Sequence, residues 1–524
     1  MSLLALGTYT VQAQADQPDY VGAKECASCH RSLARDHADS NHALALQEVS
    51  RKQTEILADF TQGEAVRQVQ FPGEDALRTF TADDVDFVVG AGQHVQRYLY
   101  KVAKDDYMVL PAEWNVTAGA WQPLTLGSDP WPSPAYDWEQ NCAACHTTNF
   151  DVERGRWQDI GVQCEACHGP ASSHVDLAKD AGRNPSDEEL TAIQGAIYRS
   201  ADPQVCAQCH SQGQSPDGHP YPVGYRPGAN LSDYFQLVPD DSGDHWWIAG
   251  HASQQNMQSN EWLMSRHATS LTDMQTSDQA ADACLTCHSQ DARQAAALVA
   301  QVKAGDRDGL PPDALTVTNA QWGVTCTTCH YEHTDSKEPF NLVQPANDLC
   351  TSCHTNPADS ATVHHPVREM FEGVSLVPGI DGFPGNHFKA DDGPRCVTCH
   401  MQALPVADGT TRASHGFTPI LPGDSEQVPS ACAGCHDTLT TTDLELLVTN
   451  TQASVKARLE TDQAQFASLP QPADGSAELA RYQQASAALD FVRNDGSFGV
   501  HNYTYTDTLL TAAEQELAAL SGAT

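Results

Sequence analysis

The sequence predicts a mainly α-helical protein with much irregular loop, organised around nine copies of one short motif. Three observations predict this class. All 18 cysteines of the 524 residues fall into Cys-x-x-Cys-His motifs. Only 40% of the residues are hydrophobic, which is below the share of ordinary globular chains. From residue 441 onward, apolar residues recur at helical spacing.

The net charge limits the partners that the chain can bind. The sequence has 29 basic and 68 acidic residues, which gives a formal charge of -39. Like charges repel, so nucleic acid and anionic membrane surfaces are disfavoured as partners. No stretch approaches the roughly 18 apolar residues of a transmembrane helix, and we expect no transmembrane segment.

The nine motifs account for every cysteine, whereas random placement of the same residues gives about 0.03 motifs per chain. The cysteines are Cys26, Cys29, Cys142, Cys145, Cys164, Cys167, Cys206, Cys209, Cys284, Cys287, Cys326, Cys329, Cys350, Cys353, Cys396, Cys399, Cys432 and Cys435. The motif histidines are His30, His146, His168, His210, His288, His330, His354, His400 and His436.

The spacing of the motif is typical of covalent haem attachment. Two thiols three positions apart can form thioether bonds to the two vinyl groups of one haem, and the adjacent histidine then reaches the iron. Zinc ribbons also use Cys-x-x-Cys, but they do not require histidine at the next position. Thioredoxin-like redox motifs do not recur nine times in one chain. The sequence therefore predicts nine c-type haems with these nine histidines as proximal iron ligands.

Fourteen of the 23 histidines lie outside the motifs, so the sequence can supply a second histidine ligand to every iron. Histidine pairs imply lower haem potentials than methionine ligation. His174 and His333 closely follow a motif and are expected to serve a neighbouring haem. His364 and His365 are adjacent, and we expect one of them to ligate. The distal candidates are His42, His94, His174, His251, His267, His333, His365, His387, His415 and His501.

Four segments are predicted along the chain. Residues 1–15 are interpreted as the remnant of an export signal, because Ala13-Gln14-Ala15 fits a signal-peptidase site. Residues 16–310 form an N-terminal region with haems 1–5, and residues 311–440 form a region with haems 6–9. Residues 441–524 form a helical C-terminal region. We therefore expect a periplasmic or extracellular protein.

A small β element is predicted at 66–117. Large side chains alternate over Arg97–Val102, and a turn at Lys104–Asp106 precedes Tyr107–Leu110, which indicates a β-hairpin. Val66–Phe71 and Phe87–Val89 are expected to join it.

Three helices are predicted in the C-terminal region. The first ends near Pro470, the second stops at Gly496, and the third starts near Asp507. His501 lies in the turn before the third helix, and we expect it to return to an iron.

Several short stretches resemble multihaem cytochromes c. Tyr20–His30, followed by Ser40–Ala43, resembles the opening of the cytochrome c554-like group, as do residues 138–174. Gly90–Tyr98 is similar to a segment of these proteins in which the histidine, here His94, is a ligand. Asp490–His501 is similar to the C-terminal helical region of multihaem nitrite reductases, hydroxylamine oxidoreductases and octahaem tetrathionate reductases.

The sequence departs from the enzymes of that superfamily in its catalytic motif. Their nitrite and tetrathionate reductases bind the catalytic haem through Cys-x-x-Cys-Lys, which does not occur here. The crosslinking tyrosine of the hydroxylamine oxidoreductases cannot be assigned by position. The sequence identifies no catalytic residue, and we expect an electron carrier in anaerobic respiration or extracellular electron transfer, with redox proteins as donor and acceptor.

Two alternatives stay open. One is a reductase or oxidoreductase of small nitrogen or sulfur oxyanions at one five-coordinate haem. Arg97, Arg226 and Arg266 are its candidate anion contacts, although each is also explained as a haem-propionate partner or a surface charge. The other is a subunit of a cytochrome filament or other homo-oligomer.

Overall fold

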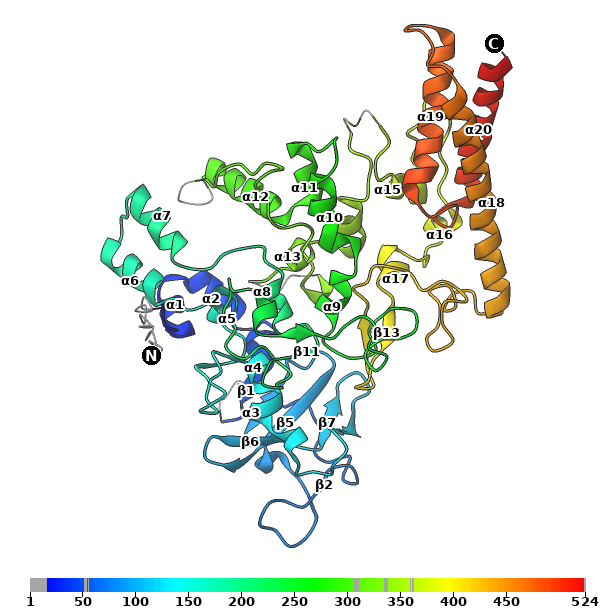
Figure 1. The fold of residues 1–524 in the computed structure, drawn as a ribbon. Coiled ribbons are helices and arrows are strands. Elements are labelled where there is room, and N and C mark those ends of the chain that lie inside the picture. Colours follow the sequence, from blue (N-terminus) through cyan, green and yellow to red (C-terminus); the bar gives the residue numbers. More distant parts are fainter. Residues whose placement is uncertain are drawn as a thin grey trace, which may run out of the picture.

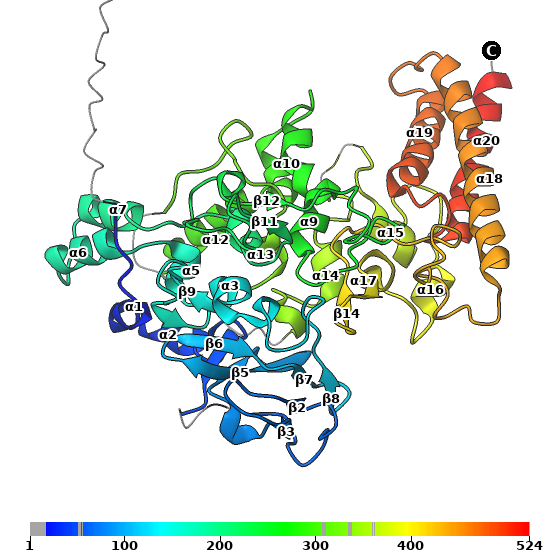
Figure 2. The ribbon, with the colours of Figure 1, turned by 60° about the horizontal axis from the view of Figure 1, so that its bottom comes forward.

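The computed structural model describes residues 17–522 except 51–53, 55, 306–310, 334–337, 359 and 361. The proposed export-signal segment 1–15 and the predicted boundary at 310 lie outside these residues. The fold is mixed, with 40% helix and 11% strand in several small sheets. Strand is thus more widespread than one small β element. Figures 1 and 2 show a sheet domain, a central region of short helices and a separate helical bundle.

The main sheet has six antiparallel strands in the order β1-β4-β5-β7-β8, with β6 also paired to β5. Its strands are β1 Leu46–Glu48, β4 Phe87–Val89, β5 Val95–Ala103, β6 Asp106–Val109, β7 Ala112–Asn115 and β8 Ala120–Pro123. The predicted hairpin is confirmed as β5–β6. The predicted bounds of the β element were too narrow, because β1 and β8 lie beyond them and pair by contacts that local patterning does not reveal.

The two faces of this sheet bury different clusters because successive side chains on a strand alternate. Leu99 and Val89 pack with Trp138 and Ala143 on one face. Tyr98 and Val88 pack on the other, together with aromatic residues of the 56–80 segment. The four other sheets have two strands each: β2 Gln68–Val69 with β3 Arg78–Thr79, β9 Thr147–Thr148 with β10 Asp159–Ile160, β11 Gly213–Gln214 with β12 Gln236–Leu237, and β13 Ala403–Pro405 with β14 Thr411–Ala413.

Short helices fill the region between the sheet and the bundle. They are α1 Ala23–Cys29, α2 Arg31–His37, α3 Trp138–Asn141, α4 Ala143–His146, α5 Cys164–His168, α6 Ser172–Ala181, α7 Asp187–Gly195, α8 Gln204–Ala207, α9 Gln258–Leu263, α10 Arg266–Gln275, α11 Leu285–His288, α12 Gln290–Ala304, α13 Cys326–Cys329, α14 Ala346–Thr351, α15 Val367–Glu372, α16 Asn386–Lys389 and α17 Cys396–His400. Many are only one turn long. They are stabilised by tertiary contacts, since a single turn is not stable alone.

The three predicted C-terminal helices are confirmed as α18 Thr441–Ser468, α19 Ala477–Asp495 and α20 Tyr503–Gly522. Thr440 caps α18, which ends two residues before Pro470, and Gly496 terminates α19 in a left-handed conformation. The third helix begins four residues earlier than expected. The helices stand apart at one end of the molecule (Figure 1).

The bundle is held by an apolar interior that rests on the α15 segment. Leu509 and Phe491 are fully buried, and Met370 of α15 joins the same cluster. Arg458 of α18 forms ion pairs with Asp507 at 2.6 Å and Glu514 at 2.8 Å on α20. The bundle therefore presents the α19–α20 turn, with His501, to the central region.

Leu509→Ala should destabilise this bundle by about 2–5 kcal/mol, because it removes a fully buried side chain and leaves a cavity. Local unfolding free energy from native-state hydrogen exchange is the measurement. Leu446→Ala on the exposed face of α18 is the matched control and should change it by less than about 0.5 kcal/mol. Equal effects of the two substitutions would contradict the observed packing.

Candidate haem-binding sites

Eight of the nine motifs overlap short helices, namely α1, α4, α5, α8, α11, α13, α14 and α17. Four of these helices, α1, α5, α13 and α17, contain both cysteines, and residues three apart on a helix are neighbours on its surface, so both thiols lie on one side. All 18 cysteines are free thiols. Each motif therefore presents two available sulfur atoms next to a histidine, as thioether attachment of one haem requires.

Five motif histidines have their Nδ1 atom hydrogen-bonded to a backbone carbonyl. The contacts are His146 to Ala45 at 3.0 Å, His168 to Tyr198 at 2.8 Å, His288 to Ser270 at 3.0 Å, His330 to Phe340 at 2.8 Å and His400 to Phe417 at 3.0 Å. This bond fixes the ring and leaves Nε2 to face a metal.

Two histidines that bind opposite sides of one iron have a predictable separation. Metal–nitrogen bonds of about 2.0–2.1 Å and the size of the imidazole ring place the ring centroids about 6.3 Å apart. Seven motif histidines face one further histidine at 5.9–6.3 Å. The pairs are His30–His174, His168–His333, His210–His42, His330–His415, His354–His267, His400–His501 and His436–His387. Seven sites therefore have the spacing that a haem iron needs.

The facing histidines come from parts of the chain that are distant in sequence. His174 follows the third motif but faces His30 of the first. His333 lies three residues after His330 but faces His168. The His333 and His168 rings are parallel to within 4°. The sequence predicted this crossing for His174 and His333 without naming their partners.

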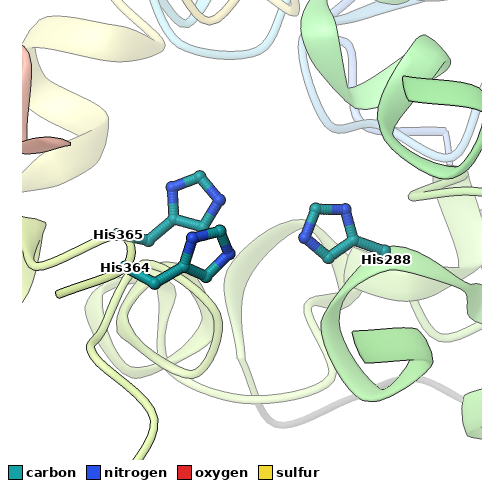
Figure 3. Close-up of side chains that lie close together, drawn as sticks. All are labelled: His288, His364 and His365. Carbon is teal, nitrogen blue, oxygen red and sulfur yellow. The ribbon is translucent and has the colours of Figure 1, made fainter. Parts of the chain in front are cut away.

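His288 of the fifth motif faces two adjacent histidines (Figure 3). Its ring centroid lies 6.4 Å from His364 and 6.0 Å from His365, and ligand atoms of all three lie within 4.8 Å of one another. His365 also lies 6.2 Å from His354, which His267 already faces at 6.0 Å. His364 was not on the list of distal candidates, and the adjacency of the two histidines is the only signal that could have included it.

Burial favours the neutral form of four of the facing imidazoles. It lowers the pKa of His42, His354, His365 and His415 to about 4, with smaller effects of neighbouring histidines. A neutral imidazole has a free nitrogen lone pair and can bind a metal, whereas an imidazolium cannot.

His501 is oriented differently from the other distal candidates. Its Nδ1 lies 2.7 Å from Oδ1 of Asp495, which is buried at the end of α19. Burial lowers the pKa of His501, but the carboxylate outweighs it and the net shift is upward. The same bond orients Nε2 toward His400, as a second-shell carboxylate does in metal sites.

Two distal candidates, His94 and His251, do not face a motif histidine. Nδ1 of His251 is bonded to Oγ of Ser414 at 2.7 Å, and the same hydroxyl donates to Glu261. His251 thus joins two loops within the protein. His94 lies just before β5, near Arg412 and Asp408. The structure therefore brings eight of the ten candidates opposite a motif histidine.

The motifs touch one another through their cysteines. Direct thiol–thiol interactions join Cys26 to Cys164, Cys145 to Cys209, Cys206 to Cys326, Cys287 to Cys353 and Cys350 to Cys396. Electrostatic interactions without a direct thiol–thiol bond relate Cys167 to Cys206, Cys329 to Cys353 and Cys399 to Cys432. With motifs numbered along the chain, these contacts form the series 1-3-4-6-7-8-9, with motif 2 branching from 4 and motif 5 from 7.

Two family models match parts of the chain. The model of the doubled CXXCH motif matches residues 318–359, and that of cytochrome c554 and c-prime matches residues 127–169. The chain is a multihaem c-type cytochrome. Its motifs and opposed histidines fit haem, which supplies an iron that cycles between two oxidation states when bound.

Solved structures of similar fold are also multihaem cytochromes. The outer cell wall cytochrome OcwA is 29% identical, with a TM-score of 0.76 over 95% of this chain and 99% of that one. An undecahaem cytochrome from the S-layer of Carboxydothermus ferrireducens is 20% identical, with a TM-score of 0.59 over 97% of this chain and 71% of that one. No curated protein sequence matches the cytochrome.

The pairing of His42 with His210 predicts the effect of His42→Ala. In the haem-loaded cytochrome this substitution should convert one low-spin haem to high spin, because it removes one of two facing imidazoles. His37→Ala is the control, since both ring nitrogens of His37 are engaged by Val162 and Ser40. Electron paramagnetic resonance measures the spin states. A new high-spin signal in the control, or none in His42→Ala, would refute the pairing.

Proposed function

We propose that the chain is an exported cytochrome with nine c-type haems that passes electrons along a row of mostly bis-histidine irons. The main observation in support of this proposal is the contact between cysteines of different motifs. Each cysteine sulfur is the attachment point of one haem edge, so a contact such as Cys350 with Cys396 brings two macrocycle edges together. The row then runs through haems 1, 3, 4, 6, 7, 8 and 9.

The histidine pairs support transfer rather than chemistry at most sites. An iron with imidazoles on both sides changes oxidation state with little rearrangement of its ligands. Histidine pairs also favour low potentials. The protein's task at these sites is to hold two rings about 6 Å apart, as it does for His168 and His333.

The proposed location and partners rest on the net charge of the chain and on its similarity to two solved structures. Two proteins of similar structure are an outer cell wall cytochrome and an S-layer cytochrome. In the described residues, no helix is long and apolar enough to cross a bilayer. With a net charge of -39, the surface favours basic redox proteins or metal ions as partners. We propose a site of action outside the cytoplasm, in respiratory or extracellular electron transfer.

Intact mass spectrometry of the mature cytochrome tests the haem count. We expect the polypeptide mass plus nine haems, because every motif has two free thiols and an adjacent histidine. A colourless product or a smaller adduct would remove the corresponding haems from the row. The same spectrum reports whether residues 1–15 have been removed.

The row predicts different effects of losing haem 6 and haem 5. Among the cysteine interactions of the described residues, haem 6 links haems 1–4 to the rest, whereas haem 5 is a branch. Cys326→Ala/Cys329→Ala should therefore leave only part of the haems in fast exchange with an electrode. Cys284→Ala/Cys287→Ala should leave all eight remaining haems in exchange.

Film voltammetry counts the exchanging haems, and intact mass confirms eight haems in each variant. Far-ultraviolet circular dichroism checks that both variants keep their helices. Equal exchange in the two variants would disprove the proposed order of haems.

A reductase at one haem is the second candidate function. It is favoured by one observation, the absence of a facing histidine at His146 among the described residues.

A further inference from the structure

His146 differs from the eight other motif histidines. Its only ring contact among the described residues is with Trp138, at 5.7 Å. All 23 histidines lie in the described ranges, and none faces His146. Its Nδ1 is bonded to the Ala45 carbonyl, so Nε2 is directed to an iron as at the paired sites. The second motif therefore has a proximal ligand and no distal histidine.

The sheet face that packs against this motif carries a charged pair beside its apolar cluster. Cys142 of the motif contacts the cluster that contains Leu99 of β5. Arg97 lies two residues before Leu99 and thus on the same face. Its Nε donates to Oε2 of Glu113 on β7 at 2.6 Å. Gln122 donates to the other carboxylate oxygen at 2.6 Å.

In the described part of the chain, the Arg97 guanidinium has hydrogen-bond donors that its ion pair with Glu113 does not use. The Glu113 side chain is only 2% exposed and occupies one edge of the guanidinium through Nε. In the described part of the chain, the two terminal amino groups of Arg97 have no protein acceptor. Burial raises the pKa of Cys142 and lowers that of His146, and Arg97 has a smaller electrostatic effect on both groups, so the guanidinium lies within electrostatic reach of this motif.

Two other side chains, Arg412 and His94, lie in the neighbourhood of Arg97. Arg412 of β14 lies near Arg97, but its guanidinium is occupied by Asp408 at 3.0 Å and by the Thr411 carbonyl at 3.0 Å. His94 lies near Arg412. Arg412 and Asp408 thus neutralise each other, while Asp137 and Glu139 add negative charge near Cys142.

We propose that haem 2, held by Cys142, Cys145 and His146, is a five-coordinate haem that binds small exogenous ligands, with Arg97 donating hydrogen bonds to anionic ones. Nitrite and cyanide represent this class of ligand. The inference rests on haem attachment, as the proposed function does, but not on the order of the row. His94 is not a ligand of this iron.

Spectroscopy of the full-length, haem-loaded cytochrome tests the open position. We expect a high-spin ferric signal from one haem in nine, and binding of one carbon monoxide per molecule after reduction. Haem content is counted first, so failure of haem attachment is distinguished from failure of this inference. A fully low-spin protein that binds no carbon monoxide would overturn it. His94→Ala should leave the spin states unchanged, and a new high-spin signal in that variant would identify His94 as the ligand instead.

Anion affinity tests the role of Arg97. Arg97→Gln should weaken cyanide and nitrite binding about tenfold or more, because a charge-assisted hydrogen bond is lost, while carbon monoxide stoichiometry stays at one. Arg97→Lys should recover part of the affinity. Arg481→Gln, at a remote exposed ion pair, should change neither.

The double variant Arg97→Gln/Glu113→Gln guards against misfolding, since it removes both members of the buried pair. It should show the same loss of anion affinity as Arg97→Gln. Unchanged anion affinity in both Arg97 variants would assign Arg97 to a haem propionate or to the sheet alone, and would overturn its proposed role.

Discussion

The structure depends on one constraint, that two imidazoles must lie about 6 Å apart on opposite sides of each proposed iron. The two rings come from distant segments. His42 precedes the main sheet and faces His210, and His501 leaves the C-terminal bundle to face His400. Each pair would therefore tie two parts of the chain together, as a crosslink does. This explains how a chain with 40% hydrophobic residues can adopt a defined fold through a region of one-turn helices.

Conventional cores lie at the two ends and support the ligands there. The Ala45 carbonyl, which orients His146, immediately precedes β1 of the main sheet. Asp495, which orients His501, is the last residue of α19 in the bundle. In both places an apolar cluster fixes the backbone, and the backbone or a buried carboxylate fixes the ring. Packing thus acts on the proposed iron sites through hydrogen bonds to Nδ1.

The sites are not equivalent, and their differences follow from their surroundings. Burial, with smaller effects of neighbouring histidines, lowers the pKa of His42, whereas at His501 the Asp495 carboxylate outweighs burial and raises the pKa. His146 has no facing histidine among the described residues but has Arg97 in its neighbourhood. The proposed function and the proposed open haem are compatible, because motif 2 is a branch and the proposed series from motif 1 to motif 9 does not pass through it.

The sequence by itself determined the chemistry that lies within a few residues: the nine attachment motifs, the β5–β6 hairpin and the three C-terminal helices. These features depend on spacing and periodicity, which are local. Only the tertiary structure decided which histidine faces which. His94 lies in a stretch that resembles a ligand-bearing segment, and His251 and His415 have no distinguishing pattern, yet of these three only His415 faces a motif histidine. Partners such as His42 and His210 are brought together by packing between segments far apart in the chain, and no local pattern records that packing.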